Sequence, residues 1–150
     1  MGCCPGSKMM EFSQRAGDER GQRLSHLRQW PVQLHLLSPE APYFQGADVL
    51  LSADCVAYAL ADFHKDHLRG HSLAIACPKL DGGQESYLEK VIALIDGAKI
   101  NTLTVMIMQV PCCMGLVALV QQALARAERQ IPVQVKVVSL QGEILREEWL

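Results

Sequence analysis

The sequence has few aromatic residues, no excess of charge of either sign and no long uninterrupted apolar run. Phe, Trp and Tyr make up 5% of its 150 residues and the formal net charge is -2, so its composition gives no reason to expect binding to nucleic acid. The longest mainly apolar stretch, residues 107–120, is interrupted by Pro111 and Gly115, and this argues against a membrane span. We therefore expect neither nucleic acid nor a membrane as a partner.

Several recognisable motifs are also missing. Without a C-x-x-C pair the sequence has neither a zinc ribbon nor a thioredoxin-like redox motif, and without G-x-x-x-x-G-K-[ST] or G-x-G-x-x-G it has no phosphate-binding motif of those types. The opening residues, "MGCCPGS", resemble neither a secretion signal nor a complete myristoylation signal. We expect a cytoplasmic protein whose six cysteines are thiols or metal ligands rather than disulfides.

What the sequence does contain is a series of short apolar runs separated by helical patterns. Runs of this kind are typical of parallel strands that are covered on both faces, and they occupy residues 48–53, 72–77, 102–110 and 133–138. Apolar spacing predicts helices over residues 56–70, 85–98 and 115–130. The alternation predicts an α/β fold, a three-layer α/β/α sandwich with a mostly parallel sheet of about five strands.

The two ends of the chain fit this architecture differently. Residues 1–29 are polar and predict a partly flexible N-terminal arm, whereas residues 30–150 predict a single α/β domain. Residues 31–37 alternate apolar and polar side chains, which predicts a strand near the edge of the sheet. Residues 139–145 predict a turn at Gly142 that leads into a short final strand.

Cysteines follow three of the predicted strands directly. Cys55, Cys77 and the adjacent pair Cys112 and Cys113 each lie where an apolar run ends. Because parallel strands bring their carboxyl ends to one edge of a sheet, where ligands of open α/β sheets bind, we expect these thiols to share that edge. Burial of each cysteine as a small core residue stays open as the alternative.

A shared group of thiols suggests a metal centre. Cys55 and Cys113 precede predicted helices, whose first turns favour the thiolate form that binds metal, and Cys4 would supply a further ligand if the arm folds back. Four thiolates, or three with a histidine or water, suit tetrahedral zinc or an iron–sulfur cluster. Neighbouring side chains point in different directions, so one of Cys112 and Cys113 is expected to bind and the other to pack.

Three further titratable residues are candidates for this edge. Asp54 and Asp81 are the carboxylates that we place there, because each follows a predicted strand. His64, three residues from His67, is a weaker candidate for a metal or proton-relay site, and exposure on a helix face is its alternative interpretation.

The chain resembles, over roughly residues 28–150, the C-terminal region of ferredoxin-type proteins of anaerobic bacteria and archaea that bind 4Fe-4S clusters. The segments that carry the resemblance are "WPVQLHLLSPEAPYF", "GADVLLSADCVAYALADFH", "LAIACPKLD", "YLEKVIALI" and "TVMIMQVPCCMGL", with "CCPGS" near the start similar to the family's "GCPGS". That family carries its recognised cluster ligands in an upstream C-x-x-C-x-x-C-x-x-x-C-P module, which this sequence does not contain.

The resemblance implies an association with iron–sulfur chemistry, and leaves open whether this region binds a cluster itself. Cys3 falls at a position where the family has another residue, so we exclude it. Cysteines that coincide with those of the family's recurring segments are Cys4, Cys55, Cys77, Cys112 and Cys113.

Three functions are consistent with these features. The first is a redox accessory domain that holds a 4Fe-4S cluster or zinc through the strand-end cysteines, with a ferredoxin-type or other redox protein as partner. The second is a zinc-dependent hydratase or hydrolase, with metal-bound water at Cys55 and Cys77 and with His64 and Asp54 nearby. The third is a cofactor-free interaction domain, and a homodimer is compatible with all three.

Overall fold

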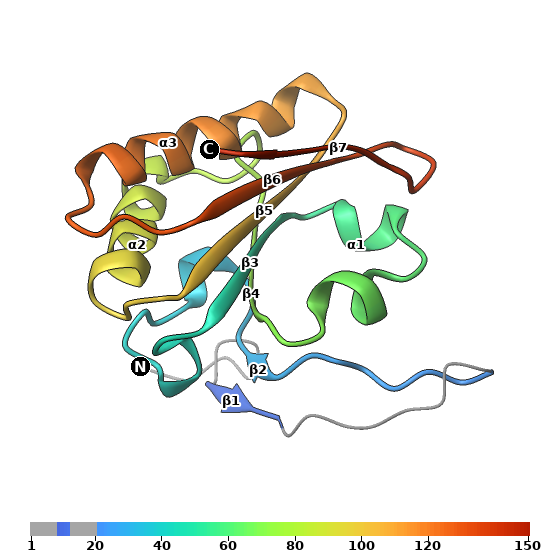
Figure 1. Ribbon diagram of the computed structural model, residues 1–150, viewed down its shortest axis with the longest axis horizontal. Helices are drawn as coiled ribbons and strands as arrows, with labels where there is room; N and C mark the ends of the chain where they lie inside the picture. Colours follow the sequence, from blue (N-terminus) through green and yellow to red (C-terminus); the bar gives the residue numbers. More distant parts are fainter. Residues whose placement is uncertain (1–8, 13–20) are drawn as a thin grey trace.

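A five-stranded, mostly parallel sheet forms the centre of the protein. Figure 1 shows the computed structural model, which describes residues 9–12 and 21–150. In the spatial order β4-β3-β5-β6-β7, the first four strands run parallel and the last runs antiparallel to β6. Its strands are β3 (Asp48–Ala53), β4 (Ser72–Ala76), β5 (Thr102–Met108), β6 (Val133–Val138) and β7 (Ile144–Trp149).

Helices cover both faces of the sheet, which confirms the predicted three-layer sandwich. On one face, α2 (Gln84–Asp96) and α3 (Met114–Arg126) pack side by side; the other face carries α1 (Val56–Ala59) and a π-helical turn, η4 (Phe63–Leu68) (Figure 1). None of the helices in the described part of the chain is long and apolar enough to cross a membrane.

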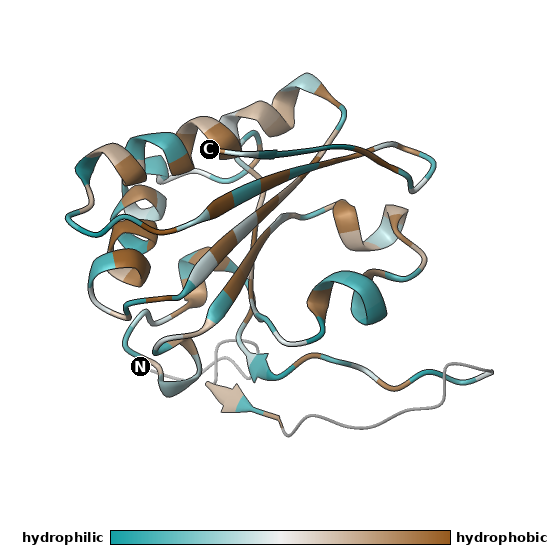
Figure 2. Ribbon diagram, viewed as in Figure 1, coloured by the Kyte–Doolittle hydropathy of each residue, from teal (hydrophilic) through white to brown (hydrophobic). Residues whose placement is uncertain are grey.

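Burial of apolar side chains on both faces explains why these runs form central strands. Val49 and Leu50 of β3 and Val105 and Met106 of β5 are fully buried, so neighbouring residues pack on opposite faces of the sheet. Figure 2 shows apolar stretches along β3 and β5 and a more hydrophilic β7, which lies at the edge of the sheet.

The chain reverses its direction of travel across the sheet between β3 and β5. After β3 it passes through α1 and η4 to β4 on one side, whereas after β5 it passes through α3 to β6 on the other side. Ligands of open α/β sheets usually bind where the loops after neighbouring strands leave toward opposite faces, and in this sheet that position lies between the ends of β3 and β5. We call the carboxyl ends of β3, β4 and β5, with the loops that follow them, the carboxyl edge.

The prediction of a strand over residues 31–37 is wrong. A short strand β2 (Gln29–Trp30) pairs with β1 (Met10–Glu11), and the chain then forms a 3-10 turn, η2 (Leu34–Leu36). Lys90 of α2 stabilises this turn, because its Nζ atom donates to the carbonyl oxygens of Leu34, His35 and Leu37 at 3.1, 2.6 and 2.9 Å. These carbonyl groups bind a side chain that is distant in sequence, and no local pattern predicts such a contact.

The single helix predicted over residues 56–70 is likewise divided. Its first part is the one-turn helix α1, and its second part is the π-helical turn η4, which places Phe63 and Leu68 in the core. Gly70, with φ of +81°, ends the segment as predicted. Gly142, with φ of +85°, forms the predicted turn before the final strand β7.

Candidate functional site at the carboxyl edge

Four free cysteines lie at the carboxyl ends of three adjacent strands. Cys55 follows β3 by two residues, Cys77 follows β4 directly, and Cys112 and Cys113 belong to a 3-10 turn, η5 (Pro111–Cys113), that opens α3. Since β3 lies between β4 and β5, these cysteines follow three neighbouring strands of the sheet. The structure thus places each of these sequence-predicted cysteines on the predicted edge.

A close backbone approach connects the loop after β4 to the start of α3. A Cβ atom added to Gly115 would lie 3.2 Å from the Cβ atom of Pro78, which is closer than neighbouring carbon atoms normally pack. Glycine at position 115 therefore allows the two loops to meet across the end of β3. This contact brings the loop that carries Cys77 toward the turn that carries Cys112 and Cys113.

The adjacent cysteines differ in their surroundings. The side chain of Cys113 packs into the core with a relative exposure of 9%, whereas Cys112 is exposed. Burial raises the pKa of the Cys113 thiol; a hydrogen bond with the backbone of Met108 opposes this, and the neighbouring Cys112 and Cys55 raise the pKa further. Burial of the Cys113 thiol therefore opposes the thiolate form that was expected at the start of α3.

These thiols share an edge without forming a ready-made metal site. Among residues 9–12 and 21–150, no three His, Cys, Asp or Glu side chains are grouped so that they could hold a metal ion. Cys4, proposed from the sequence as a further ligand, lies outside the described residues. Cys55 and Cys112 are exposed, and one side-chain torsion with three staggered positions sets the direction of each thiol.

Asp81 fixes the loop that carries Cys77. Its Oδ2 atom accepts hydrogen bonds from the Cys77 backbone N–H at 2.8 Å, from Gln33 Nε2 at 3.1 Å and from the Tyr87 hydroxyl group. Burial and the hydrogen bond to Asp81 raise the pKa of Tyr87, so the hydroxyl group keeps its proton and remains a donor. Asp81 was predicted for this edge, but Gln33 and Tyr87 were not.

His35 completes this polar cluster. Its ring stacks on that of Tyr87 with centroids 3.9 Å apart, and its Nε2 atom lies 2.6 Å from the carbonyl oxygen of Gly82. Gly83, with φ of +71°, precedes α2 directly and lies close to the same ring. The glycine-rich segment is thus a turn that packs around His35.

At this edge, the side chain of Asp54 has an oxygen that receives no hydrogen bond from the described part of the chain. Among the described residues, its Oδ1 atom is buried and has no hydrogen-bond partner. Burial and the negative charge of Asp81 raise the pKa of Asp54. A buried carboxylate oxygen without a donor is costly, which makes Asp54 a candidate for binding something brought from outside.

His64 belongs to η4, on the face of the sheet that carries α1. Its Nδ1 atom accepts a hydrogen bond from the His26 backbone N–H at 3.0 Å, and burial followed by the charge of His26 lowers its pKa. Asp54 and His64 thus line the same pocket, of about 210 Å³, and no described cysteine lines it.

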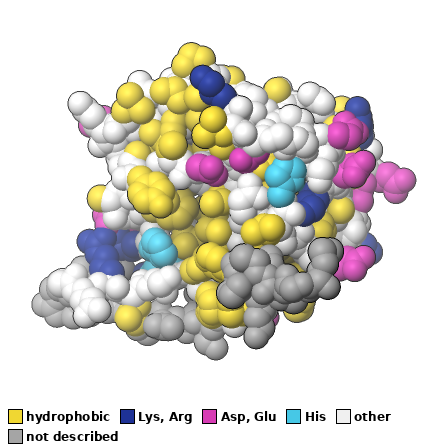
Figure 3. Space-filling view, turned by 180° about the vertical axis from the view of Figure 1, so that it is seen from behind, with side chains coloured by type: hydrophobic (Ala, Val, Ile, Leu, Met, Phe, Trp, Pro, Cys, Tyr) yellow, Lys and Arg dark blue, Asp and Glu magenta, His cyan; other side chains and the backbone are white. Residues whose placement is uncertain are grey.

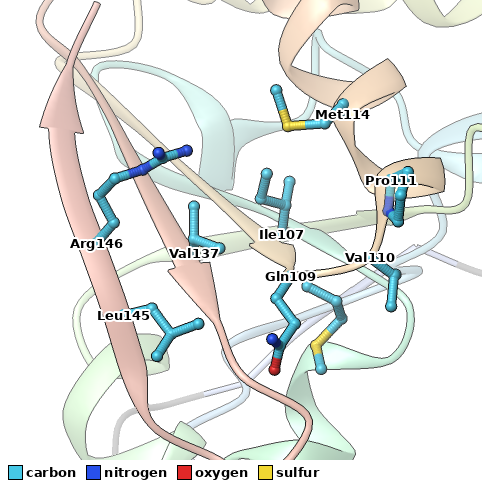
Figure 4. Close-up of a pocket in the computed structure, with 9 residues that line it drawn as sticks. Ile107, Gln109, Val110, Pro111, Met114, Val137, Leu145 and Arg146 are labelled. Carbon is cyan, nitrogen blue, oxygen red and sulfur yellow. The ribbon is translucent and has the colours of Figure 1, made fainter.

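A second pocket, of about 520 Å³, lies beside the η5 turn (Figure 4). Ile107 and Val137 form an apolar floor, and Arg146 of β7 extends over it toward Met114 (Figure 4). Arg146 also pairs with Glu148 at 3.3 Å. This pocket suits an apolar group that enters next to the cysteine pair.

Comparison with known proteins identifies the class. The chain belongs to the Rossmann-like domain family, whose sequence profile matches residues 41–150. It is similar to an uncharacterized protein of Archaeoglobus fulgidus, with 28% identity over 122 residues that cover 81% of this chain and 84% of that protein. No solved structure matches the chain significantly.

Proposed function

We propose that this Rossmann-like domain is a redox accessory domain that binds a 4Fe-4S cluster or zinc at its carboxyl edge. The observation that carries the proposal is that free cysteines follow three adjacent strands at the sheet edge where this architecture usually binds its ligands. Thiolates are the ligands that iron–sulfur clusters and many zinc sites use. When bound, the centre would supply electron transfer if it is a cluster, or structural stability if it is zinc.

In this proposal the four described cysteines have different roles. Cys55 and Cys112 are exposed and Cys77 is partly exposed, so a metal reaches these three thiols without opening the core. Cys113 is buried in the core, so in this proposal it packs and does not bind the metal. Cys4 would be the further ligand, because it coincides with a cysteine of the family that the sequence resembles.

The protein's own residues would prepare the edge for metal binding. Asp81 holds the Cys77 loop through its backbone N–H, and Gly115 lets this loop approach the start of α3. Such support orients ligands before the metal arrives and reduces the conformational freedom that binding must remove. A ferredoxin-type redox protein is the partner that we propose to dock over this edge.

The test is the metal content of the full chain purified without oxygen, with Cys55→Ser and Cys77→Ser combined as the test variant. We expect the variant to lose at least about tenfold in metal affinity relative to the parent. Cys3→Ser is the matched control, because Cys3 is excluded from the ligand set, and it should keep the full metal content. Circular dichroism of each variant checks that the fold is retained.

Retention of the parent's metal content by the double variant would contradict the proposal. A metal-free parent whose unfolding is insensitive to chelator would favour a cofactor-free interaction domain instead, since a bound structural metal stabilises the folded state.

A further inference from the structure

The pocket shared by Asp54 and His64 is a second place at which this protein can bind a small molecule. It has a volume of about 210 Å³ and lies between β3, β4, α1, η4 and the segment around β2. Its walls include the aromatic side chains of Trp30, Tyr58 and Phe63. A cavity of about 150 Å³ suffices for benzene, so this pocket has room for one aromatic ring with a small polar substituent.

The exposed face around this region is suited to an apolar ligand. Figure 3, viewed from the side opposite to Figure 1, shows a band of hydrophobic side chains with carboxylates and histidines at its margins. Tyr58 has a relative exposure of 94%, so part of the pocket wall is accessible to solvent. A molecule can therefore enter without unfolding of the core.

Asp54 supplies a hydrogen-bond acceptor that nothing in the described chain uses. Its Oδ1 atom is buried without a partner among the described residues, whereas the hydroxyl group of Ser52, also in the wall, donates to the carbonyl oxygen of Ala53 at 3.0 Å. After a rotation of the Asp54 carboxyl group toward the pocket, a ligand N–H group could donate to this oxygen and remove the cost of leaving it unsatisfied.

His64 supplies the complementary donor. Because its Nδ1 atom accepts a hydrogen bond from the His26 backbone N–H, the neutral ring carries its proton on Nε2. That N–H group is a donor on a residue that lines the pocket. The pocket thus combines aromatic walls with one acceptor and one donor, a small set of polar groups of the kind that orients a ligand.

We propose that this pocket binds a small aromatic carboxamide or a similar heterocycle, with its N–H group on Asp54 and its carbonyl oxygen on His64. The ring would pack against Trp30 and Phe63. This inference does not rest on the proposed metal site, because no described cysteine lines the pocket.

The test uses benzamide as the probe and Trp30 as the reporter. The chain has two tryptophans, so Trp149→Phe leaves Trp30 as the sole tryptophan, whose emission can be excited selectively at about 295 nm, where tyrosine absorbs little. We expect a saturable change in Trp30 emission, with a dissociation constant of about 1 mM or lower. Toluene, which has the ring but no amide, should bind at least about tenfold more weakly.

Two variants on this background locate the binding site. Asp54→Asn should weaken benzamide binding about tenfold, because a charged acceptor is lost, and Ala57→Leu should abolish it by filling the pocket. Asp66→Asn is the matched control, since Asp66 is an exposed carboxylate outside the pocket. Thermal unfolding of each variant confirms that it is folded.

The absence of a saturable response, or equal benzamide affinity in the Asp54→Asn and Asp66→Asn variants, would overturn the inference. Because Cys55→Ser and Cys77→Ser leave the pocket wall intact, they should lower metal content without changing benzamide affinity. Failure of the pocket and failure of the metal site are therefore distinguishable.

Discussion

Asp48 and Asp54 lie at the two ends of the same strand, β3, and their carboxyl groups have opposite surroundings. At the amino end, Asp48 Oδ1 accepts hydrogen bonds from Asn101 Nδ2 and Thr102 Oγ1, both at 2.8 Å. At the carboxyl end, Asp54 Oδ1 is buried with no partner among the described residues.

The loops at the two ends of the sheet differ in the same way, because polar groups are hydrogen-bonded at the amino end, whereas a carboxylate oxygen at the carboxyl edge has no partner in the described part of the chain. At the amino end, Asp96 accepts hydrogen bonds from the backbone N–H groups of Glu128 and Arg129, and Arg129 Nη1 donates to the Ile95 carbonyl oxygen at 2.6 Å. At the carboxyl edge lie four free thiols and an unsatisfied carboxylate. The amino end is built for stability, whereas the carboxyl edge retains groups that are available to a ligand.

The largest expected difference concerns two glycines with positive φ, one at each end. Gly46, with φ of +64°, precedes β3 and has open space around it, whereas a Cβ atom at Gly142 would collide with the carbonyl oxygen of Ala59. We expect Gly46→Ala to cost about 1 kcal/mol from the backbone conformation alone, and Gly142→Ala about 3 kcal/mol because atoms must also move. Urea unfolding of both variants measures the difference, and equal costs would contradict it.

The next comparison concerns substitutions of Asp48, which begins β3, and of Asp54, which directly follows it. Asp48→Ala should lower the free energy of unfolding by about 1–3 kcal/mol, since it leaves the donors of Asn101 and Thr102 without their acceptor. Asp54→Ala should cost less than about 0.5 kcal/mol or should stabilise the protein, because it removes a buried oxygen that has no donor. A larger loss for Asp54→Ala than for Asp48→Ala would show that the comparison is mistaken.

Within the carboxyl edge, the thiols should differ in reactivity. With iodoacetamide and metal-free, reduced protein, the exposed Cys55 and Cys112 should react first, and Cys113 at least about tenfold more slowly. Burial raises the pKa of Cys113, so its reaction should accelerate only toward alkaline pH. Peptide mass spectrometry follows each site, and equal rates for Cys112 and Cys113 would refute this assignment.

The smallest effect concerns acid stability at the amino end. Hydrogen bonds from the backbone of Arg129 and Glu128 lower the pKa of Asp96 from its ordinary value of 3.8. Because the folded-state pKa lies below the unfolded-state value, the stabilisation is fully present above about pH 4 and is lost as the pH falls through the folded-state pKa. Asp96→Asn should therefore reduce the difference between urea midpoints at pH 7 and pH 3, and an unchanged difference would contradict the assignment.

Much of the architecture was predictable because it depends on local patterns. Apolar runs directly identify β3, β4, β5 and β6, and their carboxyl ends predict where the cysteines lie. The η2 turn was not predictable, because its carbonyl groups bind Lys90, more than fifty residues along the chain. A periodic pattern reports which side chains are buried, and it does not report which distant donor will satisfy the backbone.

The candidate site, too, has features that the sequence predicts and features that it does not. Cys55, Cys77, Asp54 and Asp81 could be placed at the carboxyl edge from strand ends alone. Their partners could not, because the cluster around Asp81 joins Gln33, the Cys77 backbone and Tyr87 from three separate segments. The raised pKa of Cys113 was missed for a similar reason, since burial of its thiol depends on how α3 packs on the sheet.

The central claim, that the carboxyl edge is a thiol-based metal site, is tested most directly by the iron, zinc and acid-labile sulfide content of the full chain purified without oxygen. The account predicts either about four irons with matching sulfide and broad visible absorbance, or about one zinc, per chain. Protein that is folded and contains neither metal in stoichiometric amount would contradict it.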